Sequence, residues 1–418
     1  MTPALGYSKM KESGVQWLGY YPAHWNLGKV KNVFSSTKTI VGDDVDNYER
    51  LALTLNGVIK RSKTDVGGLQ PEKFETYQIL RENELVFKLI DLQNVATSRV
   101  GRSPYTGIVS PAYIILHERS GRSTKYAEYY FLSMWMHHVF NQLGADGVRS
   151  NIGASALLNI PFLIPPENEQ KAIVTYLDTQ CAKIDEIIIE VKASIEDYKK
   201  WKASIIYEAV TKGLNPDVEM KDSGVEWIGK IPGHWQLSRI KNALENLDHL
   251  REPISAENRD NKIGLYDYYG ASGVIDKIDD FNVNDTVLLI GEDGANLRMR
   301  NLPLVYRASG KFWVNNHAHI LKPKQGYSYG FLAYALEAGD YNTYITGAAQ
   351  PKLSQSNLMR FPIAIPPYKE QMQIEQHLDV QCAQFDGLLE EKQALISELE
   401  SYKKSLIYEV TTGKRRVC

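Results

Sequence analysis

The sequence has few cysteines, no long apolar run and almost no net charge. Three cysteines in 418 residues are too few for a disulfide framework or a metal-binding cluster. The chain has no uninterrupted apolar run of about 18 residues, and its first residues have no basic segment followed by an apolar one, so we expect a cytoplasmic protein. A net charge of −2 gives no bulk signal for nucleic-acid binding, and any DNA-binding surface must be local.

The sequence does contain a long helical pattern that occurs twice. In residues 165–213 the apolar residues alternate four and three positions apart, which is typical of a coiled-coil seam. This row consists of Leu177, Cys181, Ile184, Ile188, Val191, Ile195, Tyr198 and Ile205, with Lys202 as its one polar member. The row returns 201 positions later within residues 366–418. We therefore predict two helices of about 40 residues that lie antiparallel and bury their stripes against each other, rather than each joining a separate bundle.

A second repeated stretch, here called the leader, precedes each globular region. Residues 10–32 return at 220–242, with 13 of 23 positions identical, including two tryptophans and one histidine. Each leader is expected to lie near the end of the other copy's helix. The predicted plan is a leader (1–25), a domain (26–164), a helix (165–213), a linker with the second leader (214–235), a second domain (236–365) and a second helix with a tail (366–418).

The two domains align only loosely, although both contain short β-type runs and turn signals. We predict strands at 50–55, 84–87 and 113–116 in the first domain, and at 274–275, 286–290 and 319–321 in the second. A helix is predicted in each, at 126–141 and at 329–338. The expected fold class is α+β: two mixed, mostly β domains separated by a pair of long antiparallel coiled-coil helices, with pseudo-two-fold duplication. A constant framework around two different domains suggests one task performed twice on two different targets.

Three features together resemble the specificity subunit of Type I restriction-modification enzymes. They are Pro-Pro-x-x-Glu-Gln at the start of each long helix, the Gly-Val-x-Trp leader that ends in His-Trp, and the duplication around two variable domains. The resemblance covers essentially the whole chain. It implies that each domain is a target-recognition domain that reads half of a bipartite, asymmetric DNA site, and that the helices set the spacer length.

The resemblance also implies partners. The helices would dock two methyltransferase (modification) subunits, which would carry S-adenosylmethionine, and restriction or translocase subunits would join the same complex. The chain itself would be a non-catalytic subunit without a cofactor or metal. Two alternatives remain open: a coiled-coil adaptor that binds proteins without DNA specificity, and a specificity subunit of a different type of restriction system.

Basic, amide and aromatic residues in predicted loops are the candidates for DNA contact, because such side chains can pair with base edges or phosphates. In the first domain they are Lys60, Arg61, Lys63, Arg99, Arg102, Arg149 and Asn151. In the second they are Tyr268, Tyr269, Arg298, Arg300, Asn315, Asn316, His317, Gln350 and Lys352. The ordinary alternative for any one of them is a solvated loop residue.

Two motifs suggest catalysis but fail on their details. Residues 224–231 match the glycine and lysine spacing of a phosphate-binding loop, yet Ile231 stands where a hydroxyl should bind Mg²⁺. Residues 159–162 resemble the catalytic tetrapeptide of amino-methyltransferases, but no glycine-rich cofactor loop follows a strand elsewhere. We therefore predict no catalytic residue.

Overall fold

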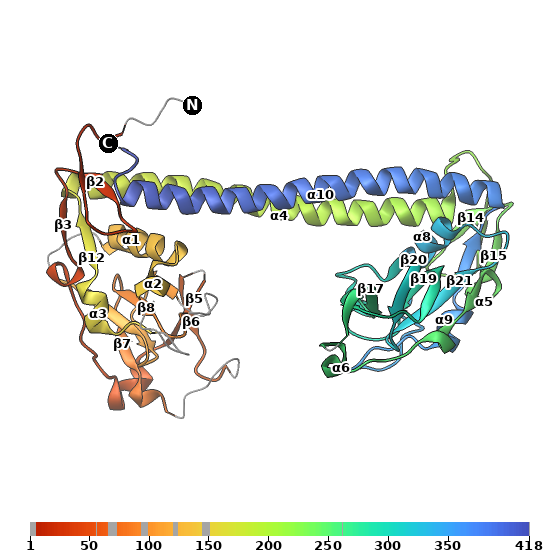
Figure 1. The fold of residues 1–418 in the computed structure, drawn as a ribbon, viewed down its shortest axis with the longest axis horizontal. Helices are drawn as coiled ribbons and strands as arrows, with labels where there is room; N and C mark the ends of the chain where they lie inside the picture. The colour runs from red at the N-terminus through yellow and green to blue at the C-terminus, as the bar shows by residue number, and fades with distance from the viewer. Residues whose placement is uncertain are drawn as a thin grey trace. The chain divides into compact units, whose positions relative to one another are not determined.

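The computed structural model describes residues 6–55, 57–65, 73–92, 99–119, 124–143, 151–260 and 262–417. The chain forms two compact units (Figure 1). Unit 1 consists of Met1–Lys192 and Ala394–Cys418, and unit 2 consists of Ala193–Gln393. Each unit therefore contains one leader, one mixed domain and half of each long helix. Within the described residues, no helix is long and apolar enough to cross a membrane.

Among its described residues, the domain of unit 1 has two four-stranded sheets, a further pair of strands and three short α-helices, and the leader adds a hairpin. The leader forms the hairpin β1 (Met10–Glu12) and β2 (Tyr20–Pro22), and β3 (Asn26–Lys29) pairs with β12 (Pro161–Ile164). One sheet has the order β6 (Gly57–Arg61), β5 (Arg50–Thr54), β10 (Gly107–Val109) and β7 (Gln78–Leu80). The other has the order β4 (Phe34–Ser35), β11 (Ile114–Glu118), β8 (Leu85–Lys88) and β9 (Arg99–Arg102). The helices are α1 (Thr124–Met136), α2 (Val139–Leu143) and α3 (Ala154–Asn159).

The prediction of one helix over residues 126–141 was wrong. The chain breaks between α1 and α2 at His138, whose φ of 57° is left-handed. A left-handed residue cannot continue a right-handed helix, so α2 starts in a new direction.

Unit 2 contains a six-stranded sheet. Its order is β16 (Leu244–Asn246), β21 (Ala318–Pro323), β19 (Val283–Gly291), β20 (Val305–Val314), β17 (Ile263–Gly270) and β18 (Gly273–Ile278). The second leader forms β13 (Met220–Asp222) and β14 (Lys230–Pro232), and β15 (Gln236–Arg239) pairs with β22 (Pro362–Ile365). The helices are α5 (Ile240–Ala243), α6 (Ala256–Asp260), α7 (Asn296–Met299), α8 (Tyr329–Ala338) and α9 (Gln355–Arg360).

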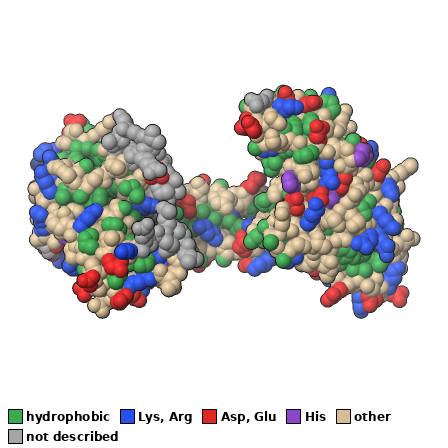
Figure 2. Space-filling view, turned by 90° about the horizontal axis from the view of Figure 1, so that it is seen from below, with side chains coloured by type: hydrophobic (Ala, Val, Ile, Leu, Met, Phe, Trp, Pro, Cys, Tyr) green, Lys and Arg blue, Asp and Glu red, His purple; other side chains and the backbone are tan. Residues whose placement is uncertain are grey.

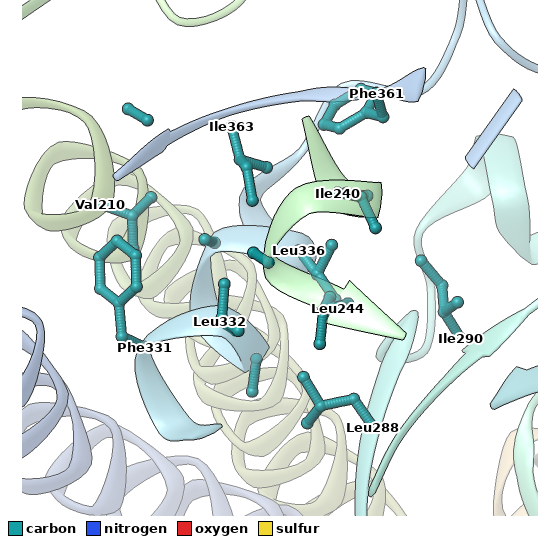
Figure 3. Packing of buried hydrophobic residues seen from close by; sticks show 14 of the residues in the cluster. Val210, Ile240, Leu244, Leu288, Ile290, Phe331, Leu332, Leu336, Phe361 and Ile363 are labelled. Carbon is teal, nitrogen blue, oxygen red and sulfur yellow. The ribbon is translucent and has the colours of Figure 1, made fainter. Parts of the chain in front are cut away.

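The core of unit 2 forms where α8 packs between the sheet and a long helix (Figure 3). Phe331, Leu332 and Leu336 of α8 are fully buried, together with Leu288 of β19. Val210 belongs to the same cluster and comes from the first long helix, α4 (Glu167–Lys212). Burial of large side chains of this kind stabilises a fold by about 1.5–3 kcal/mol each, so the long helix is part of the domain core and not an appendage.

The two long helices are α4 (Glu167–Lys212) and α10 (Tyr368–Thr411). In unit 1, Lys403 Nζ of α10 lies 2.6 Å from Asp185 Oδ1 of α4. In unit 2, Lys202 Nζ of α4 lies 2.6 Å from Asp386 Oδ1 of α10. The start of one helix therefore faces the end of the other in each unit, which confirms antiparallel pairing. The polar residue in the predicted stripe, Lys202, is explained by this ion pair.

Each leader packs against the C-terminal end of a long helix, as the sequence predicted. In unit 1 the Tyr408 hydroxyl donates to the Trp17 carbonyl at 3.0 Å, and a Cβ at Gly413 would collide with Pro22. In unit 2 a Cβ at Gly213 would lie 3.1 Å from the Trp235 ring. The φ values are left-handed, 72° for Gly413 and 76° for Gly213, and both glycines lie just past the ends of their helices, where the leader packs closely against them.

Candidate nucleic-acid interface

Three segments of unit 2 that are far apart in the sequence meet beside the end of β19. The Glu292 amide donates to the His317 carbonyl at 2.8 Å, and the Leu353 amide donates to the Glu292 carbonyl at 2.7 Å. The Gly294 amide donates to the Pro351 carbonyl at 3.1 Å. These backbone bonds join residues 291–300, 315–319 and 350–353 into one surface, here called the loop junction.

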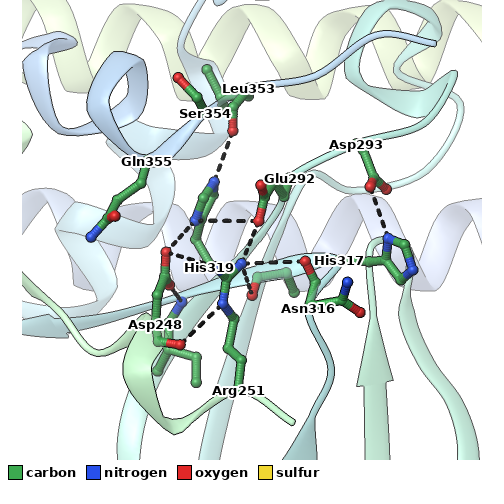
Figure 4. Close-up of polar contacts among 12 residues, drawn as sticks. Asp248, Arg251, Glu292, Asp293, Asn316, His317, His319, Leu353, Ser354 and Gln355 are labelled. Carbon is green, nitrogen blue, oxygen red and sulfur yellow. Dashed lines mark hydrogen bonds and ion pairs between the residues drawn. The ribbon is translucent and has the colours of Figure 1, made fainter. Parts of the chain in front are cut away.

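A buried polar network supports the loop junction from below (Figure 4). His319 is fully buried, with Nδ1 2.6 Å from Asp248 Oδ2 and Nε2 2.8 Å from the Leu353 carbonyl. Both ring nitrogens therefore lie within hydrogen-bond distance of an oxygen atom. Asp248 also accepts a hydrogen bond from the Ile320 amide at 2.9 Å. The network thus ties the β21 strand to the segment that ends at Leu353.

Glu292 connects this network to the basic residues around it. It accepts a hydrogen bond from Arg251, and its Oε1 lies 3.0 Å from Lys352 Nζ. Burial raises the pKa of Glu292, but the bonds from Arg251 and Lys352 outweigh burial and leave the pKa below its ordinary value. Burial also raises the pKa of Asp248, but the bond from His319, its electrostatic interaction with His319 and the bonds from Ile320 and Asn246 together outweigh burial and leave the pKa below its ordinary value. Both carboxylates therefore stay charged at neutral pH and hold the loops by ion pairs.

The loop junction contains seven of the residues predicted from sequence, namely Arg298, Arg300, Asn315, Asn316, His317, Gln350 and Lys352. Asn316 and Gln350 are exposed. The side chain of His317 is 48% exposed and that of Lys352 is 54% exposed, each paired with one carboxylate. Arg298, on α7, is also exposed. Its neighbour Arg300 instead donates to the Glu337 carbonyl and pairs with the Glu337 carboxylate at 3.7 Å.

The structure corrects the prediction for Tyr268 and Asn315. Tyr268 is only 1% exposed, and its hydroxyl accepts a hydrogen bond from the Ile254 amide at 3.1 Å. Asn315 is 5% exposed and accepts a hydrogen bond from the His317 amide at 2.8 Å. Both side chains are buried and make hydrogen bonds within unit 2, so they are not accessible to a ligand. Tyr269 is partly buried and packs edge-on against Phe312, at 5.6 Å between ring centroids.

In unit 1, three predicted residues line a cleft of about 460 Å³ beside residues 46–50. Lys60 pairs with Glu49 at 2.6 Å, and Arg61 pairs with Asp65 at 2.6 Å. Lys63 Nζ donates to the Val45 carbonyl at 2.6 Å. The cleft is therefore lined by cations that are already paired within the unit, and a polyanion would have to compete with those carboxylates.

The other predicted residues of unit 1 do not gather at this cleft. Arg102 Nε donates to Glu128 at 3.3 Å, and its guanidinium also donates to Asn83, so it is held within its own domain. Asn151 is exposed and its backbone bridges to Ile90. Arg99 lies on β9, but its side chain is outside the described residues, as is the whole of Arg149.

Charge and sequence pattern alone did not identify the supporting network. Figure 2 shows Lys and Arg side chains interspersed with Asp and Glu on the visible faces of both units, in keeping with the near-zero net charge. Arg251 and Asp248 gave no signal in the sequence. Glu292 lies in the Gly-Glu-Asp-Gly string at 291–294, which stood out only through the family resemblance.

Comparison with known proteins finds similar sequences and similar folds. Residues 232–400 match the family model described as the Type I restriction modification DNA specificity domain. The chain is 31% identical over 164 residues to a putative type I restriction enzyme specificity subunit of Haemophilus influenzae, a match that covers 39% of each chain. It is 21% identical to the putative type I restriction enzyme MjaX specificity subunit of Methanocaldococcus jannaschii, over 96% of each chain.

Two solved structures share the fold. One comes from a study of complex assembly and conformational transition of the type I R-M system; its TM-score is 0.70 at 12% identity, over 94% of this chain and 98% of that one. The other is the HsdS subunit from Thermoanaerobacter tengcongensis, with a TM-score of 0.50 at 14% identity, over 96% of this chain and 99% of that one. Residues 232–400 are thus similar to the Type I restriction modification DNA specificity domain, and the chain shares the fold of these two solved structures.

Proposed function

We propose that this chain reads a bipartite, asymmetric DNA site, with one half-site bound by each domain. The observation that carries the proposal is the pairing of a repeated framework with two different domains. The leaders and helices match position by position, whereas the largest sheets among the described residues differ: one domain has two sheets of four strands, and the other has one sheet of six strands. Two different surfaces on one repeated frame suit two different half-sites.

We propose further that the long helices set the spacer length and dock two methyltransferase subunits. Support comes from Trp201 and Tyr402, which occupy equivalent positions of the two helices and are 58% and 49% exposed. Exposed aromatic residues are typical anchors of protein interfaces. A repeated anchor fits two copies of one partner. The partners would supply the chemistry, with S-adenosylmethionine bound in the methyltransferase and restriction or translocase subunits joining the complex.

DNA binding is tested with the full chain purified together with its partner subunits. We expect salt-sensitive binding to a duplex that contains both half-sites, with an affinity that falls steeply as the salt concentration rises. A duplex with one half-site scrambled should bind at least about tenfold more weakly. Equal binding to scrambled duplexes would favour the protein-binding adaptor instead.

Docking is tested by the stoichiometry of the complex in native mass spectrometry. Trp201→Ala and Tyr402→Ala should each remove one methyltransferase copy, and the double variant should remove both. Leu265→Ala is the matched control, because Leu265 is 89% exposed but lies on β17, away from both helices. Retention of two copies by the double variant would overturn the docking proposal and leave DNA reading intact.

A further inference from the structure

His317 is held at its backbone and at one ring nitrogen. Its amide donates to Asn315 Oδ1 at 2.8 Å, and its carbonyl accepts from the Glu292 amide at 2.8 Å. Its Nδ1 lies 2.8 Å from Asp293 Oδ2. Nε2 has no hydrogen-bond partner among the described residues, and the side chain is 48% exposed. Nε2 is therefore the one polar atom of His317 left for a ligand.

Asp293 determines what Nε2 can offer. An ionised carboxylate only accepts hydrogen bonds, so Nδ1 carries a proton and points it at Asp293. In the neutral ring Nε2 is then an acceptor with a fixed direction. In the protonated ring the same atom, in the same place, becomes a donor. A carboxylate that orients a histidine in this way is a common supporting arrangement around functional imidazoles.

The charged groups around His317 leave this atom free. Glu292 is occupied by Arg251 and Lys352, and Arg251 also donates to the Asn316 carbonyl at 3.3 Å. Lys352 is joined to Asp293 by a β-bridge, so it lies on the same surface as the ring. Lys352, at 54% side-chain exposure, suits a phosphate contact, whereas a directional imidazole nitrogen suits a base edge.

We propose that His317 determines specificity at one base pair by presenting Nε2 to a base edge, with Asp293 as the residue that positions the ring. This inference rests on the function proposed above and names the atom that reads. As an acceptor, neutral Nε2 fits the exocyclic amino group of adenine or cytosine. As a donor, the protonated ring fits N7 or O6 of guanine. The preferred base at one position should therefore change with pH.

The test selects bound duplexes from a pool randomised across both half-sites, using the complex of the full chain with its partner subunits. At a pH of about 8 we expect adenine or cytosine to be selected at one position of one half-site. At a pH of about 5.5 the ratio of guanine to these bases at that position should rise by about tenfold or more. His317→Gln should abolish the pH-dependent shift at that position and leave the other positions unchanged. His249→Gln is the control, since His249 is also an exposed histidine of unit 2.

The positioning role of Asp293 has its own readout. Asp293→Ala should broaden the preference at the His317 position without creating a new one, because the ring is then free to turn. Asp293→Asn should keep most of the preference, because its amide oxygen can still accept from Nδ1. Thermal melting at both pH values checks that the network around His319 stays folded.

The outcomes separate the two proposals. Absence of any specific duplex binding would refute the proposed function. Specific binding with an unchanged base preference in His317→Gln at both pH values would overturn the role of His317 alone.

Discussion

The two units close their repeated frameworks with different polar contacts. In unit 1, Glu169 at the start of α4 accepts from the Tyr7 hydroxyl at 2.9 Å, from Trp25 Nε1 at 2.9 Å and from His24 Nε2 at 2.6 Å. In unit 2, the equivalent Glu370 pairs with His234 at 2.8 Å. Trp235 Nε1 is buried there and has no partner among the described residues.

This difference shows that duplication preserved the backbone frame more strictly than its hydrogen bonds. Tyr7 lies before the repeated stretch, and Asp217 stands at its counterpart position. The extra donor is therefore a feature of the first copy only. The domains also use different polar contacts: His117 pairs with Glu84 in unit 1, whereas His319 pairs with Asp248 and lies 4.0 Å from Glu292 in unit 2.

The largest effect is expected when the unit 2 network loses Asp248. Asp248→Ala leaves the buried His319 ring without its carboxylate partner and removes the acceptor of the Ile320 amide. We expect the free energy of unfolding of unit 2 to fall by about 3–5 kcal/mol, as it does when one partner of a buried ion pair is removed. Hydrogen exchange of the Ile320 amide measures it within β21. Exchange unchanged from the unaltered chain would show that the network does not stabilise this unit.

A smaller and unequal effect is expected at the two leader contacts. Glu169→Gln weakens three hydrogen bonds to a charged acceptor and should cost about 2 kcal/mol, whereas Glu370→Gln weakens one and should cost about 1 kcal/mol or less. Hydrogen exchange of the Trp25 and Trp235 amides compares the two leaders in one molecule. Equal destabilisation of the two would contradict the asymmetry described above.

The His117–Glu84 pair should make unit 1 sensitive to pH. The hydrogen bond that His117 donates to Glu84 raises the pKa of His117 above 6.5. Burial raises the pKa of Glu84, but this bond, the bond from the Arg81 amide and the nearby positive charges together outweigh burial and leave the pKa below 4.5. The histidine contribution is full below pH 6.5 and is lost as pH rises through the raised pKa. The carboxylate contribution is full above pH 4.5 and is lost as pH falls through the lowered pKa.

The pair should therefore stabilise unit 1 most between pH 4.5 and 6.5. The difference in Tm between the unaltered chain and Glu84→Gln, followed across pH, should peak in this window. A difference that keeps growing above pH 8 or so would mean that the two groups do not titrate as a pair.

The smallest effects are expected at the two equivalent ion pairs of the helix seam. Lys202→Ala and Lys403→Ala each remove one pair with a 2.6 Å contact, and each pair includes an aspartate more than half exposed. We expect each substitution to lower the free energy of unfolding by about 0.5 kcal/mol or less, and by the same amount for both. Denaturant titration of each variant provides the comparison, and clearly unequal losses would show that the two halves of the seam are not equivalent.

The sequence predicted the features that depend on local pattern. The helices α4 and α10 follow from one long and mostly apolar stripe each. Helix α8 begins where Ser328 caps it by accepting from the Phe331 amide at 3.2 Å. The break at His138 was missed because neither glycine nor proline marks it. Periodicity reports which face is apolar, and it cannot report a left-handed residue that tertiary packing imposes.

The sequence predicted only part of the candidate site, because contacts between distant segments leave no local pattern. His317 and Lys352 drew attention as polar loop residues, but only backbone pairing between distant segments shows that they share one surface. Tyr268 and Tyr269 look alike in sequence, yet neighbours on a strand point to opposite faces and only the sheet shows which is buried. The polar network that supports the loop junction includes Asp248 and Arg251, and their positions in the sequence form no recognisable motif.

The most direct test replaces residues 236–365 with the corresponding domain of a relative of different specificity and maps methylated adenines across the genome of the source strain. The account predicts that one half of the modified sequence changes while the other half and the gap between them stay the same. A change in both halves, or modification at an unchanged site, would contradict the claim that each domain reads one half-site.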